Sequence, residues 1–144
     1  MIEGIKLPIT IASVFLWIGF VCAISFMEAW LKFKAPGVNL QIGLGIGRLV
    51  FSALNKMEWV FATAILIGIF IPKLNVLLPN NIWFYIPVII LIIQTIWLLP
   101  ALDKRAEMHI NLISVPPSNL HFYYVAFEII KVAALIIFSI KFFK

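Results

Sequence analysis

Two charged side chains stand in the middle of the last apolar segment of the chain. Glu128 and Lys131 lie within a run from about Phe122 to Ile140, which is long enough to cross a bilayer. A charge at that depth costs roughly 3 kcal/mol or more, so it needs a partner or a water-filled cavity. His121 and Tyr124 precede them at intervals of three and four residues, so all four side chains share one helix face. The spacing predicts a buried polar site.

Proton transfer is one chemistry that such a site supports. A carboxyl group becomes a general acid or base when burial and a neighbouring group tune its pKa. Glu58 and Glu128 both lie inside apolar segments and meet this condition. His121 could act as a proton shuttle, so these three residues are the candidate catalytic side chains.

Other polar residues collect near the same end of the predicted helices. Arg48, Ser52 and Asn55 are four and three residues apart and share a face, with Glu58 one turn further on. Apart from Glu3, the acids therefore cluster with both histidines and both arginines on one side of an antiparallel bundle. The predicted ligand-binding residues are Arg48, Asn55, Glu58, Asp103, Arg105, His121, Tyr124, Glu128 and Lys131.

A purely structural interpretation stays open for these charges. The run from Asp103 to Glu107 fits a solvated helix end with local ion pairs. Interhelical pairs such as Arg48 with Glu128, or Lys131 with Glu58, would tie helices together without handling any ligand.

The composition indicates an integral membrane protein. The 144 residues are 64% hydrophobic and only 12% charged, and the mean hydropathy is +1.12, whereas soluble domains are about 45–50% apolar. The net charge is +5, but the basic residues flank apolar runs and form no basic patch with interleaved aromatics, so no nucleic-acid partner is expected. The expected partners are the lipid bilayer and a small-molecule ligand.

The elements that position the site are four apolar helices at about 8–33, 46–71, 81–109 and 119–142. Short, proline-containing connections predict one all-α domain over residues 1–144, a four-helix antiparallel transmembrane bundle. Pro8 suits a first helical turn, and Pro87 and Pro100 should bend the third helix or free backbone groups locally. The turns are expected at 79–81 and 116–119.

Charge flanking the helices predicts an orientation. The side with the long loops around Pro36 and Pro116 carries six Lys and Arg residues, and the side with the termini carries four. This excess favours cytoplasmic long loops and outside termini, in a bacterial inner membrane. The first helix has no basic leader or cleavage motif, so we expect it to be retained.

Two further motifs are open to more than one interpretation. Gly43, Gly45 and Gly47 open the second predicted helix, where they could form an anion-binding turn with Arg48 or a small-residue packing face, and packing is favoured. The sequence contains no Glu-x-x-His pair, H-E-x-x-H motif or cysteine pair, so no metal site is predicted and no cofactor is identified. Most tryptophans lie near segment ends, as in an interfacial belt, and Trp17 is the exception.

Several short motifs resemble a known family. The segments 33–38, 47–58, 99–105, 116–121 and 124–131 are similar to small bacterial membrane proteins of the DUF4149 or transmembrane-protein-205-like type, and more distantly to the copper-resistance D-like four-helix group. The resemblance spans all four helices and implies a four-helix membrane bundle of undefined activity. The histidine and methionine pairs expected of copper carriers are not evident here.

Three function classes fit these observations. The first is binding or transport of a small polar or cationic solute, with proton coupling open and a homo-oligomer expected. The second is an intramembrane enzyme on a lipid, isoprenoid or quinone. The third is a structural membrane subunit in which the charges hold an assembly together.

Overall fold

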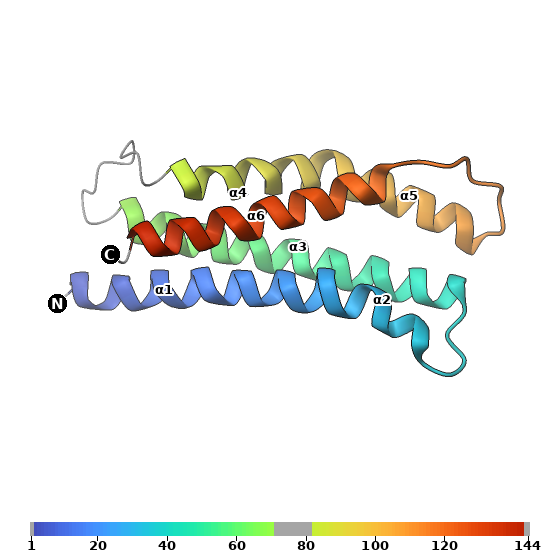
Figure 1. Ribbon diagram of the computed structural model, residues 1–144, viewed down its shortest axis with the longest axis horizontal. Coiled ribbons are helices and arrows are strands. Elements are labelled where there is room, and N and C mark those ends of the chain that lie inside the picture. Colours follow the sequence, from blue (N-terminus) through green and yellow to red (C-terminus); the bar gives the residue numbers. More distant parts are fainter. Residues whose placement is uncertain (1, 71–81, 143–144) are drawn as a thin grey trace.

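The chain folds into a bundle of four long antiparallel helices, as predicted (Figure 1). The computed structural model describes residues 2–70 and 82–142, with side chains described for 8–69 and 82–142. Within these residues, both ends of the chain lie at one end of the bundle, and the connections 35–39 and 111–119 lie at the other. We call the latter the long-loop end.

The four helices contain nine helical elements among the described residues. The first helix comprises α1 (Ile2–Val21), the π-helical η1 (Cys22–Glu28), α2 (Ala29–Leu31) and the 3-10 turn η2 (Lys32–Lys34). The second is α3 (Leu40–Phe70), and the fourth is α6 (Leu120–Phe142). The third comprises α4 (Ile82–Ile93), the π-helical η4 (Gln94–Leu98) and α5 (Leu99–Ile110).

Two predicted helix starts were wrong. The first helix begins at Ile2, so Pro8 lies inside it and not in its first turn. The second begins at Leu40 and not near residue 46, because the side chain of Asn39 caps it: Asn39 Oδ1 accepts a hydrogen bond from the Ile42 amide at 2.8 Å. The glycine-rich segment is therefore helical and does not form an open anion-binding turn.

The third helix deviates from α-helical geometry directly before Pro100. A proline has no N–H and its ring collides with the carbonyl of the fourth residue before it, here Ile96. Ile96 lies in η4, whose wider π turn relieves that contact. The predicted local disturbance at this proline is thus confirmed as a π segment. The predicted turn at 79–81 lies outside the described residues.

The fourth helix begins as predicted after the Pro116–Asn119 turn. The hydroxyl oxygen of Ser118 accepts a hydrogen bond from the Leu120 amide at 3.2 Å. The side chain of Ser118 therefore caps the helix.

The bundle has three zones along its axis. The half near the termini holds an apolar core that includes Trp17, Ile65, Phe84 and Phe138. Charged and polar side chains fill the middle, and a cavity occupies the long-loop end. Each helix packs against two others, with α1 on α3 and α6, and the third helix on α3 and α6.

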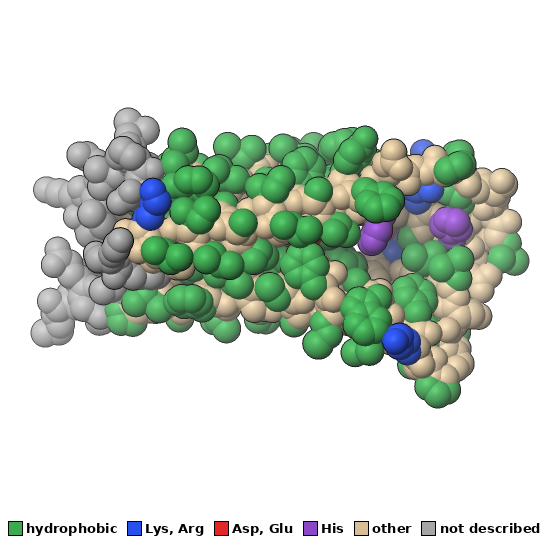
Figure 2. All heavy atoms as spheres, viewed as in Figure 1, with side chains coloured by type: hydrophobic (Ala, Val, Ile, Leu, Met, Phe, Trp, Pro, Cys, Tyr) green, Lys and Arg blue, Asp and Glu red, His purple; other side chains and the backbone are tan. Residues whose placement is uncertain are grey.

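Three helices are long and apolar enough to cross a membrane: Pro8–Lys34, Leu40–Ile69 and Ile82–Ile110. Their outer faces carry many exposed large apolar side chains, which is the surface expected of a protein solvated by lipid (Figure 2). The chain is therefore an integral membrane protein in its overall character. The helix α6 lies alongside α4 and places Glu128 and Lys131 at the middle of the bundle.

Candidate functional site

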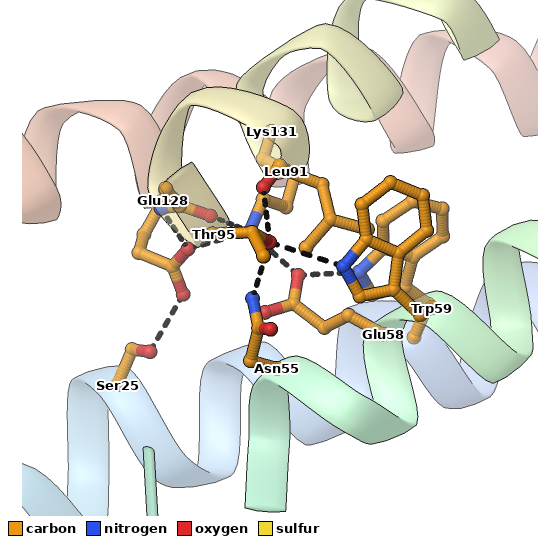
Figure 3. Close-up of polar contacts among 10 residues, drawn as sticks. Ser25, Asn55, Glu58, Trp59, Leu91, Thr95, Glu128 and Lys131 are labelled. Atoms are coloured by element: carbon orange, nitrogen blue, oxygen red, sulfur yellow. Dashed lines mark hydrogen bonds and ion pairs between the residues drawn. The ribbon is translucent and has the colours of Figure 1, made fainter. Parts of the chain in front are cut away.

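The middle of the bundle contains a closed cluster of charges, which we call the buried charge network and define as Glu58, Gln94, Glu128 and Lys131. All four residues are at most 1% exposed. The ammonium group of Lys131 donates to Glu58 Oε2 at 2.5 Å, to Gln94 Oε1 at 2.5 Å and to Glu128 Oε1 at 2.7 Å (Figure 3). Its three hydrogens are therefore all used.

Neighbouring side chains donate further hydrogen bonds to both carboxylates. The indole of Trp17 donates to Glu58 Oε2 at 2.8 Å, and Gln94 Nε2 donates to Glu128 Oε1 at 2.7 Å. The hydroxyl of Ser25 donates to Glu128 Oε2 at 2.6 Å. Among the described residues, no fully buried side-chain nitrogen or oxygen lacks a partner. A network satisfied to this degree holds its geometry firmly.

The two π-helical segments supply partners for the network. Ser25 lies in η1, and Gln94 lies at the start of η4. A π turn rotates and widens the helix locally, which changes the direction in which its side chains point. Both segments lie at the depth of the network, so the departures from α-helical geometry coincide with the buried polar groups.

The network carries an uneven formal charge. Two carboxylates and one ammonium sum to −1 when all are ionised. Such a set is costly in a low-dielectric interior, and the attraction between its members offsets the cost only with close geometry and full hydrogen bonding. The close distances and the several hydrogen bonds above favour this offset, and they join α3, α6 and the third helix to one another.

A cavity of about 730 Å³ opens between the four helices at the long-loop end. We call it the long-loop cavity. Figure 2 shows histidine and Lys or Arg side chains around a hollow at this end of the molecule. Its polar lining residues are Lys32, Arg48, Ser52, Asn55, Thr95, Asp103, Arg105, His109, Ser118, His121 and Tyr124.

One ion pair crosses the rim of the cavity from α3 to α5. Arg48 donates to Asp103 through Nε at 2.6 Å and through a terminal nitrogen at 3.0 Å, which is a bidentate arrangement. Glu107 lies 3.9 Å from the same guanidinium. The side chains of Arg48 and Asp103 are 32% and 49% exposed, so water screens this pair far more than the buried charge network.

The inner end of the cavity meets the network. Asn55 Nδ2 donates to Thr95 Oγ1 at 2.9 Å, and both residues line the cavity. Tyr124 also lines it and lies beside Ser25, which binds Glu128. Tyr124 and Ser25 thus connect the lining of the cavity to Glu128.

The predicted site residues divide into two groups. Six of them line the cavity, whereas Glu58, Glu128 and Lys131 are buried and do not line it. The predicted pair of Lys131 with Glu58 forms, whereas Arg48 pairs with Asp103 and not with Glu128. The run from Asp103 to Glu107 is therefore not purely a solvated helix end. The cavity-lining group is Arg48, Asn55, Asp103, Arg105, His121 and Tyr124.

Four contributors were not predicted as site residues. Trp17, Ser25 and Gln94 belong to the hydrogen bonding of the network, and Lys32 lines the cavity. A tryptophan away from the interfacial belt and a glutamine inside an apolar run were the available signals. Ser25 and Lys32 gave none, because their roles depend on which helices become neighbours.

The described residues contain no group of three or more His, Cys, Asp and Glu side chains that could hold a metal ion. The chain matches no protein-family model, no curated protein and no solved structure. The geometry of the two regions is therefore the basis for the function.

Proposed function

We propose that this integral membrane protein binds a small polar solute in the long-loop cavity, which the solute enters from the long-loop face of the membrane. One observation carries the proposal: all four helices direct polar side chains into a cavity of about 730 Å³. Pockets for small molecules commonly have volumes of about 300–1,000 Å³ and combine apolar walls with a few polar groups. Phe51 and Leu99 are among the apolar residues of its wall.

The buried charge network supports binding from one face in preference to conduction. Lys131 lies between Glu58 and Glu128, and each of the three residues is at most 1% exposed. A solute that crossed the membrane through one subunit would have to separate these charges. Transport through the bundle, or through a homo-oligomer, is therefore a secondary expectation.

An intramembrane enzyme has less support. Of the three candidate catalytic residues, only His121 lines the cavity, whereas Glu58 and Glu128 are buried and bonded. A structural subunit whose charges hold an assembly together also has less support. The buried charge network joins helices of one chain, and among the described residues no fully buried side-chain nitrogen or oxygen is left without a partner.

The expected setting is a bacterial inner membrane with the long loops in the cytoplasm, as the excess of Lys and Arg favours. The resemblance to DUF4149-like proteins stays a prediction and adds no activity. Cysteine-accessibility mapping in vesicles tests the topology. Substituted cysteines at Arg48 and His121, in a Cys22→Ala background, should react from the same face, and reaction from opposite faces would overturn the bundle as the site's scaffold.

Ligand-induced stabilisation tests the binding function. The purified protein is heated in detergent with a panel of small anions, cations and zwitterions, because a bound solute raises the unfolding temperature. Ser52→Trp should fill the cavity and abolish the effect, since Ser52 lines it. Ala53→Trp is the matched control, since Ala53 is exposed on the same helix and is not a lining residue. If no solute stabilises the protein, or both variants respond alike, the proposal fails.

A further inference from the structure

The charges that line the long-loop cavity are unequal in sign. Three lining residues are cationic, Lys32, Arg48 and Arg105, and one is acidic, Asp103. The bidentate pair of Arg48 with Asp103 accounts for one charge of each sign. Lys32 and Arg105 therefore leave an excess of positive charge among the lining residues, which is the opposite of what a cation-binding site needs. Glu28, which pairs with Lys32, is not a lining residue.

Lys32 is held in an unusual position for a lysine. Its side chain is only 10% exposed, and its nearest acid, Glu28, lies 3.4 Å away. Its amine lies over the rings of Phe33 and Phe51, at 5.5 and 5.7 Å from their centroids. A lysine amine has three donors, and in the described structure this one makes a single, long hydrogen bond.

Gly47 makes room for that amine. A Cβ added to Gly47 would lie 3.1 Å from Lys32 Nζ, which is closer than ordinary van der Waals contact. The absence of a side chain on α3 thus lets the amine rest against the cavity wall. The small-residue packing predicted for this segment serves to seat a charge as well as to bring helices together.

Arg105 presents the second cationic group from α5. Among the side chains of residues 8–69 and 82–142, none forms an ion pair or hydrogen bond with its guanidinium, whereas its neighbour along the cavity, Arg48, forms two hydrogen bonds with Asp103. A guanidinium offers five donors in a planar fork that matches phosphate oxygens. His109 and His121 line the same cavity and add hydrogen-bonding capacity.

From these charges and the apolar wall, we infer that the cavity binds an amphiphile with an anionic phosphate head group. Lys32 and Arg105 bind the phosphate, and the apolar part of the ligand lies against Phe51, Leu99 and Leu102. Basic pockets between transmembrane helices near the membrane surface suit lipid phosphates. The inference rests on the proposed function, because it places the phosphate head group in the same cavity as the proposed polar solute. It differs in that the polar group carries an apolar part.

Native mass spectrometry with defined probes tests the inference. The detergent-solubilised protein is titrated with phosphatidylglycerol, with phosphatidylcholine of the same acyl chains, and with inorganic phosphate. Phosphatidylglycerol should bind in preference to both. Arg105→Gln and Lys32→Gln should each weaken its binding by about tenfold or more, because each removes charge-assisted hydrogen bonds.

Two charge-matched controls separate a site from general electrostatic attraction. Lys104→Gln and Lys34→Gln remove the same charge from exposed neighbours that do not line the cavity, so they should leave binding unchanged. The two test variants lie on different helices, and an unchanged unfolding temperature identifies those that fold.

Each contrary outcome has a definite meaning. Both lipids contain a phosphodiester and differ in net charge, so equal binding of the two overturns the anionic head group. Equal losses in test and control variants overturn the phosphate site. Tight binding of inorganic phosphate alone overturns the amphiphile. In the thermal-unfolding panel, a cation could instead stabilise the protein, with the stabilisation lost in Ser52→Trp. The binding function would then stand and this inference would fail.

Discussion

The buried charge network and the long-loop cavity lie one helical turn apart, yet they treat polar groups in opposite ways. In the network, Lys131 has all three hydrogens bonded and its carboxylate partners are at most 1% exposed. In the cavity, Arg105 lacks a partner among the described residues and the Arg48–Asp103 pair is partly exposed. Charged groups of the same types are thus paired and buried in the network, whereas in the cavity they are partly exposed and one of them has no partner among the described residues.

This contrast shows that the depth of a charged residue within a membrane helix does not by itself identify a functional group. Glu58 and Glu128 lie deepest and gave the sharpest sequence signal, but both are buried and accept hydrogen bonds from Lys131 and from other side chains of the chain. Groups nearer the long-loop end retain donors for a ligand. The predictions below test this division by measuring the free energy of unfolding in mixed micelles.

The largest effect is expected for Lys131→Met. Removing the amine leaves two buried carboxylates side by side without a counter-charge, which should cost about 3–5 kcal/mol of unfolding free energy. Lys56→Met, an exposed site on α3, should cost less than about 0.5 kcal/mol. A similar small loss for both variants would show that the network does not stabilise the bundle.

Removing every charge of the network should recover much of that loss. The triple variant Glu58→Gln, Glu128→Gln, Lys131→Met keeps amide oxygens for Trp17 and Ser25, which donate to these side chains. Buried ion networks are often no more stable than neutral replacements. The free energy of unfolding of the triple variant should therefore be about 2 kcal/mol or more above that of Lys131→Met. If the triple variant is the less stable of the two, the charges themselves are required. Its lipid binding should match that of the unmodified protein.

An intermediate effect is expected from the glycines beside the cavity. A Cβ at Gly45 meets nothing within 4 Å, whereas one at Gly43 would overlap the ring of Phe33. Gly45→Ala should therefore stabilise α3 by about 0.5–1 kcal/mol. Gly43→Ala should be less stable than Gly45→Ala by about 1 kcal/mol. Equal stabilities would mean that the packing of Phe33 on α3 contributes nothing.

The smallest change in stability is expected for Arg48→Gln. Its ion pair with Asp103 is partly solvated, so its loss should lower the free energy of unfolding far less than Lys131→Met does. Raising the salt concentration should reduce even this difference, because exposed charges are screened. A loss comparable to that of Lys131→Met would erase the distinction between the two regions.

Several features were accessible from the sequence because they depend on local order along the chain. Apolar length, proline positions and the turn at 116–119 predicted the helices 82–110 and 120–142 to within a residue. The three- and four-residue spacing placed Tyr124, Glu128 and Lys131 on one buried face, as observed. The start of α3 was missed, since three glycines weigh against a helix and the capping by Asn39 outweighed them.

By itself, the sequence determined the four-helix membrane character of the protein and the helix faces that carry its charges. Only the tertiary structure decided which charges are paired and which remain open to a ligand. The partners of Lys131 on the other helices lie 73 and 37 residues away in the chain. One of them, Gln94, lies in the π-helical segment η4. Pairing at such separations depends on helix rotation and depth, which side-chain packing sets and residue spacing along one helix does not encode.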